Sequence, residues 1–143
     1  MDIMIWALRK NDPDDWLDMP AEGYRLINEV EEKFKPNLDK TKYATRYPQN
    51  DSNVSRSLVI EYLIDLDRKI KGEFLFGEQP KLADIAISPF VRQFANIDIK
   101  WFNEFGWEKL QNWLKAFVES KMFDKSQKKF VQWRPNANPV FFP

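Results

Sequence analysis

The stretch QPKLADIAISPFVRQFA, residues 79–95, decides the fold. Its apolar residues lie around nearly the whole surface of a helix, which is typical of a helix at the centre of a domain. With Lys81 as N-cap, Asp84 is the third helical residue. Its carboxylate can there accept a hydrogen bond from the N-cap amide and favour the positive end of the helix dipole. We predict a central helix over 81–97, with Asp84 as a structural capping residue.

Two residues are unusual in such a helix. Pro89 lies in the helix interior, where proline costs roughly 3 kcal/mol, so we expect packing to impose a bend there. Arg92 places a cation among apolar residues, and an unpaired buried charge is expensive. We therefore expect Arg92 to pair with a carboxylate or with backbone carbonyls.

Helical spacing of apolar residues continues through the rest of the chain. We predict helices over 1–9, over 21–46 with a bend or division at Pro36, over about 58–70 with Gly72 as the stop, over 107–117, and within 120–130. The expected connectors are 10–20, 47–53 with N-cap candidates Asp51 and Ser52, 73–80, about 98–106, and an irregular tail from 133. No alternating strand pattern or internal repeat is visible, so the sequence predicts an all-α helical bundle.

The composition limits the classes of function. A chain of 143 residues with 43% apolar and 15% aromatic residues can form one domain with a substantial core. Its 22 basic and 22 acidic residues balance, so no overall field attracts nucleic acid or an anionic membrane. The start has no basic leader, and no apolar run approaches the ~20 residues of a membrane span. We expect a soluble, cytoplasmic protein.

Two residue types are missing altogether. Without cysteine the chain has no disulfide, thiolate metal site or thiol nucleophile. Without histidine it lacks the commonest general base and metal ligand. Acidic residues cluster only in NDPDDWLD, residues 11–18, which indicates a turn. We expect no catalytic residue and no metal site in this chain.

Several segments carry a resemblance to a known family. One pair of segments consists of GEQPKLADI, residues 77–85, and ISPFVRQF, residues 87–94. The other pair consists of FKPNLDKTKY, residues 34–43, and RYP, residues 46–48. The first pair resembles the start and continuation of the central helix in the C-terminal domain of glutathione S-transferases of the bacterial type. The second pair is similar to the first long helix of that domain. The resemblance covers essentially the whole chain, although Lys81 stands where the family usually has Ser or Thr.

The resemblance implies a division of the chain. Residues 20–143 would form the helical C-terminal domain, and residues 1–19 would be a remnant of the last helix of a thioredoxin-like domain plus a linker. In this family the thioredoxin-like domain binds glutathione and supplies the thiol-activating residue, and the chain has no counterpart of it. The resemblance thus implies a truncated transferase whose missing partner is that domain. Met4, Ile5, Trp6 and Leu8 would then lack a covering layer unless they fold back, so we expect self-association, and the parent family is dimeric.

The segment KTKYATRY, residues 40–47, contains the candidate substrate-binding residues Lys42, Tyr43, Arg46 and Tyr47. In the family the first and central helices of this domain wall the pocket for the electrophilic co-substrate. Cations and aromatic rings on one face can hold an anionic or flat ligand. The alternative is a solvated helix face with an Asp39–Lys42 pair.

Two hypotheses for function remain open. The first is the helical substrate-binding half of a glutathione transferase, whose parent reaction joins glutathione to electrophiles. This half would not catalyse the reaction alone, and glutathione would be a co-substrate of the parent enzyme rather than a ligand of this chain. The second is a free-standing helical module for protein–protein interaction. The electrophile, the dimer geometry and the cause of the truncation do not follow from the sequence.

Overall fold

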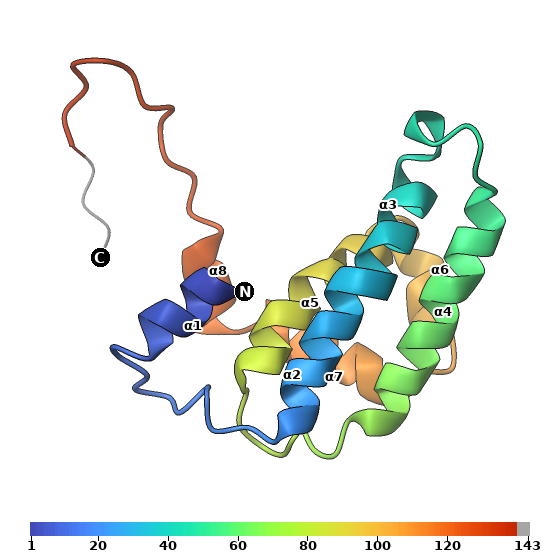
Figure 1. Cartoon of the computed structure of the whole chain (residues 1–143), viewed down its shortest axis with the longest axis horizontal. Helices are drawn as coiled ribbons and strands as arrows, with labels where there is room; N and C mark the ends of the chain where they lie inside the picture. The colour runs from blue at the N-terminus through green and yellow to red at the C-terminus, as the bar shows by residue number, and fades with distance from the viewer. Residues whose placement is uncertain (140–143) are drawn as a thin grey trace.

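The computed structural model describes residues 1–139 and is all-α, as predicted (Figure 1). Apart from an isolated bridge between Phe74 and Gly77, these residues contain no β structure. The elements are α1 (Asp2–Leu8), α2 (Ala21–Glu29), the π-helix η1 (Val30–Phe34), α3 (Lys35–Lys42), the 3₁₀ turn η2 (Ala44–Arg46), α4 (Ser52–Lys69), α5 (Leu82–Ala95), α6 (Ile99–Glu104), α7 (Glu108–Val118) and α8 (Lys121–Ser126). No helix within residues 1–139 combines the length and the apolar character needed to cross a membrane.

The bundle is organised around the continuous rod formed by α2, η1 and α3. The rod packs against α4 through α3 and against α5 through α2 and α3, and α7 packs on both α4 and α5 (Figure 1). The enclosed core is rich in aromatic and branched aliphatic side chains, which supply most of the driving force for folding. Its largest fully buried side chains include Trp107, Trp113, Phe34, Phe102, Leu38, Leu63, Leu66 and Ile87.

The first long helix agrees with its prediction near Pro36 and differs from it at its end. The π-helical turn η1 interrupts the α-helix just before Pro36, where the sequence predicts a bend or division. Proline has no N–H to bond the carbonyl four residues earlier, and a π turn changes the bonding register at that point. The helix ends at Lys42 rather than near residue 46, because Tyr43 leaves the helical region with φ −117° and ψ 45°. Pro48 disfavours helical geometry at the residue before it, so a 3₁₀ turn closes the segment.

Helix α4 starts at its predicted cap and ends within one residue of its predicted end. The Asp51 side chain accepts a hydrogen bond from the Asn53 amide at 2.8 Å. The helix ends at Lys69, so Gly72 is not its stop. A Cβ at Gly72 would lie 2.8 Å from the Gly77 carbonyl oxygen. Gly72 is therefore required by the close approach of the 72–77 turn rather than by a helix end.

The segment around residues 98–106 is not a plain connector, because it contains α6. Asp98 caps this helix by accepting a hydrogen bond from the Trp101 amide at 3.0 Å. The rings of Trp101 and Phe105 pack against Trp107, with centroids 5.6 Å and 4.1 Å from it. A helix of this length is unstable alone, so tertiary aromatic packing must hold it. Periodicity over so few residues gave no signal.

The first turn of α7 is capped from another helix. The Asp67 carboxylate in α4 accepts a hydrogen bond from the Leu110 amide at 2.8 Å. Lys109 donates from its ammonium group to the Ile70 carbonyl, 3.2 Å away, at the end of α4. These two bonds tie the start of α7 to the end of α4.

Helix α1 folds back on the bundle. Met1, Met4, Ile5 and Leu8 are partly buried against the core. Met1 and Met4 face Val30 and Phe90 across a small cavity of about 190 Å³. The opposite side of α1 is uncovered, since Ile3 is 81% exposed and Trp6 is 60% exposed. Among the four side chains predicted to lack a cover, only Trp6 remains largely exposed.

Candidate functional site

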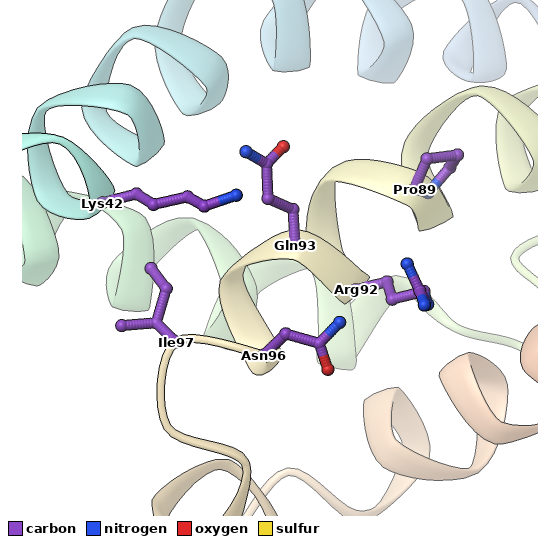
Figure 2. Close-up of a pocket in the computed structure, with 6 residues that line it drawn as sticks. All are labelled: Lys42, Pro89, Arg92, Gln93, Asn96 and Ile97. Atoms are coloured by element: carbon purple, nitrogen blue, oxygen red, sulfur yellow. The ribbon is translucent and has the colours of Figure 1, made fainter. Parts of the chain in front are cut away.

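A pocket of about 470 Å³ lies between the end of α3 and the second half of α5 (Figure 2). Its volume is within the range of small-molecule sites, about 300–1,000 Å³. The lining residues are Lys42 from α3, Pro89, Arg92 and Gln93 from α5, and Asn96 and Ile97 just after it. Four of these residues follow the spacing i, i+3, i+4 and i+7, so they share one face of α5 and its C-cap.

The predicted binding residues are brought together only in part. The Lys42 ammonium group lies 5.1 Å from the Tyr43 ring centroid, and the Arg46 guanidinium lies 4.5 Å from the same centroid. Both cations thus lie over one ring, which gives a compact basic-aromatic cluster. Only Lys42 of this group lines the pocket. Tyr47 is half-buried, and the two cations lie over the Tyr43 ring rather than over the Tyr47 ring.

Lys42 is not part of the ion pair that a plain solvated helix face would provide. Within residues 1–139 it makes no ion pair with Asp39. Its side chain extends from the end of α3 towards Gln93 (Figure 2). The charge of Lys42 is therefore available to a ligand in the pocket.

The expectation for Arg92 is wrong. In the described part of the chain, the guanidinium pairs with no carboxylate and donates to no carbonyl. It lies over the Phe123 ring of α8 instead, 5.0 Å from the centroid. A half-buried guanidinium can rest on an aromatic face and keep its N–H groups free at the edge. The rule that a buried charge needs an ionic partner applies to full burial, whereas Arg92 is half-buried at the pocket wall.

Gln93 and Asn96 are site residues that the sequence argument missed. Their carboxamides also line the pocket, and no side-chain hydrogen bond to protein satisfies them within residues 1–139. The signal that could have found them is their spacing with Arg92 on one face of a helix otherwise surrounded by apolar residues. Lys42, the lining residue from α3, could not be found this way, because its place in the pocket depends on where α3 ends.

The electrostatics of the pocket favour an anion. Its described lining carries two cations and two carboxamides and includes no acidic side chain. These groups can bind and orient a negatively charged ligand, whereas no thiol, imidazole or carboxylate lines the pocket to act as nucleophile or base. Among residues 1–139, potential metal-ligating side chains also form no group of three or more. The lining of this pocket therefore supplies groups that can bind and orient a ligand.

Asp84 lies outside this pocket and is buried at 2% exposure. Its Oδ2 accepts a hydrogen bond from the Lys81 amide at 2.9 Å, which is the contact expected of a capping residue. Its Oδ1 accepts two more, from the Leu75 amide at 2.9 Å and from the Trp113 indole N–H at 2.7 Å. Burial raises the pKa of Asp84, and these three hydrogen bonds act in the opposite direction. Asp84 therefore joins α5, α7 and the 72–77 turn.

Lys81 cannot supply the other half of a capping box, because an ammonium group has no acceptor. It donates instead to the Asp15 carbonyl at 2.9 Å. Asp15 belongs to the acidic segment 11–18, which forms a turn as the sequence predicts. Asp12 accepts hydrogen bonds from the Trp16 and Leu17 amides at 2.9 Å and 2.8 Å.

Comparisons with protein-family models, with curated proteins and with solved structures give no match to this chain. The resemblance to glutathione S-transferases therefore rests on the residues quoted above and stays a prediction. What the structure defines is an all-α protein with a cationic surface pocket between its first long helix and its central helix.

Proposed function

We propose that this chain is the helical substrate-binding half of a glutathione transferase. The observation that supports this proposal is the position of the pocket. It lies between the rod ending in α3 and helix α5, and the resemblance assigns these two helices to the wall of the electrophile pocket. The pocket has the size of a small-molecule site and carries unpaired polar groups rather than a purely apolar lining.

In the parent reaction the glutathione thiolate attacks an electrophile, a carbon–sulfur bond forms, and the leaving group departs or the electrophile takes up a proton. A separate thioredoxin-like domain would bind glutathione and stabilise the thiolate. The residues of this chain would bind and orient the electrophile. By this proposal the chain alone neither conjugates an aryl halide nor binds glutathione with a dissociation constant below about 1 mM, which corresponds to a binding free energy of about −4 kcal/mol.

The test is a chimera that joins the thioredoxin-like domain of a bacterial glutathione transferase to Met1. We expect the chimera to conjugate 1-chloro-2,4-dinitrobenzene faster than the thioredoxin-like domain does alone. The glutathione affinity of both proteins, measured by calorimetry, shows whether the added domain has folded. A chimera that binds glutathione normally but conjugates no faster than the isolated domain would contradict the proposal.

A second candidate function, a helical module for protein–protein interaction, is favoured by one observation. Ile3 and Trp6 project from α1 with most of their surface in water, although α1 has its own apolar face against the core. Exposed apolar side chains that lie together often mark a contact surface. Light scattering across a concentration series should detect self-association, and I3Q/W6Q should abolish it. A monomer at all concentrations, with no glutathione-chimera activity, would remove support from both candidates.

A further inference from the structure

We propose that the pocket between α3 and α5 binds the carboxylate of a small aromatic acid. The proposal names the ligand class for the site discussed above. It rests on the proposed function only for the reaction that the ligand would enter, because binding itself needs no glutathione. Lys42 and Arg92 would neutralise the carboxylate, and Gln93 and Asn96 would donate hydrogen bonds to it.

The pocket lining is rich in hydrogen-bond donors. All four polar side chains in the lining can donate, and none of them has a hydrogen-bond or ion-pair partner in the described part of the protein. A half-buried cation such as Arg92 normally finds a carboxylate, since removing charge from water is costly. Here aromatic rings at 5.1 Å and 5.0 Å hold the two cations instead. Ring contact leaves their N–H groups available, and a guanidinium can bind a carboxylate through two parallel hydrogen bonds.

The pocket also has an apolar part. Pro89 and Ile97 line it beside the polar groups, and Ile97 is 36% exposed. A flat ring could cover these side chains while its carboxylate reaches the cations. An inorganic anion would use only the polar part. The combination favours an aromatic acid over a simple ion.

A purely structural explanation accounts for only half of the lining. Lys42 lies in the last turn of α3 and Arg92 in the last turn of α5, where cations stabilise the negative end of a helix dipole. This explains the two charges. It does not explain the half-buried Gln93 carboxamide, which has no side-chain hydrogen bond within residues 1–139, whereas the exposed Asn96 carboxamide at the C-cap of α5 can be hydrated. A ligand with acceptor oxygens would give the Gln93 carboxamide a partner beside the Lys42 charge, which lies next to it (Figure 2).

The experiment is a titration of the full, ¹⁵N-labelled chain with benzoate at constant ionic strength, followed by amide chemical shifts. Benzamide is the matched neutral probe. We expect benzoate to bind with a dissociation constant of about 1–10 mM and to shift the amides of Gln93, Asn96 and Ile97. Benzamide should bind about fivefold more weakly or worse, since each lost cation contact in a partly exposed site has about this effect.

Three substitutions with matched controls complete the design. K42Q and R92Q should each weaken benzoate binding by about fivefold and leave benzamide binding unchanged. R92K keeps the charge but loses the two parallel hydrogen bonds of a guanidinium. Its benzoate affinity should therefore lie between that of R92Q and that of the unmodified chain. K40Q and R68Q remove cations that do not line the pocket, and benzoate affinity should not change.

The outcomes separate the alternatives. Equal binding of benzoate and benzamide, or unchanged benzoate affinity in both K42Q and R92Q, would overturn the proposal, as would no shift at about 50 mM benzoate. Circular dichroism shows whether R92Q has folded; if it has not, K42Q decides alone, because Lys42 is exposed. Benzoate binding in this chain combined with an inactive chimera would leave the ligand class standing and reject the transferase.

Discussion

Replacing Asp84 by alanine should destabilise the fold by more than the loss of a helix cap. A local capping role predicts about 1–2 kcal/mol. The structure adds two buried donors, because Oδ1 also accepts from the Leu75 amide and the Trp113 indole. A buried donor left without a partner costs about 1–3 kcal/mol, so with two such donors besides the cap D84A should lose about 3–8 kcal/mol of unfolding free energy. D84N keeps one acceptor oxygen and should lose less.

The assay is urea denaturation of a double-mutant cycle between Asp84 and Trp113. W113F removes one of the donors that D84A leaves unpaired, so the double mutant should lose about 1–2 kcal/mol less than the sum of the single mutants. Trp107 provides the control: its indole donates to the Phe102 carbonyl at 3.0 Å and has no bond to Asp84. The D84A and W107F losses should therefore add within about 0.5 kcal/mol.

Two results would refute this reasoning. A D84A loss below about 1 kcal/mol would show that the buried donors find other partners. Additive losses for D84A and W113F would show that the indole bond contributes nothing to stability, whatever its length.

Two further predictions follow from the buried polar groups. Burial raises the pKa of Asp84 from its usual 3.8, so at pH values between about 4 and the native pKa the folded chain binds more protons than the unfolded chain. The free energy of unfolding should therefore fall as the pH rises from about 4 through the native pKa. Urea unfolding of D84N should not show this fall, because asparagine does not titrate. Ser88 is fully buried and its hydroxyl has no hydrogen-bond partner in the described structure. S88A should be neutral or stabilise by up to about 1 kcal/mol, and a loss above 1 kcal/mol in the same assay would reveal a hidden partner.

The fold class could be predicted because periodicity and capping are local. The spacing of apolar residues located the long helices, and the position of Asp84 three residues after the N-cap identified its capping contact. The sequence could not identify Trp113 as a partner of Asp84, because the two lie 29 residues apart. Helix α6 escaped prediction because packing of Trp101 and Phe105 stabilises it, rather than an extended periodic pattern.

The pocket was less predictable than the helices. The basic-aromatic character of residues 40–47 points to the end of the first long helix, where the sequence predicts a continuous helix to about residue 46. Tyr43 breaks that helix, and Arg46 and Tyr47 consequently lie outside the pocket lining while Lys42 remains in it. Arg92 was assigned a protein partner by a general rule about buried charge. Its aromatic partner Phe123 comes from α8, a short helix whose position only tertiary structure could give.

The cap that α7 takes from α4 has a consequence for the order of folding. Asp51, Asp98 and Ser120 each cap a helix from the residue just before it, so those helix starts can form as the local chain forms. The Leu110 amide instead donates to the Asp67 carboxylate, 43 residues earlier in the chain, so this cap forms only when α7 meets α4. Closing that loop costs entropy before any contact repays it. Helix α7 should thus become stable late, after α4 is in place, and a fragment cut between the two would lose the start of α7 even with its own sequence intact.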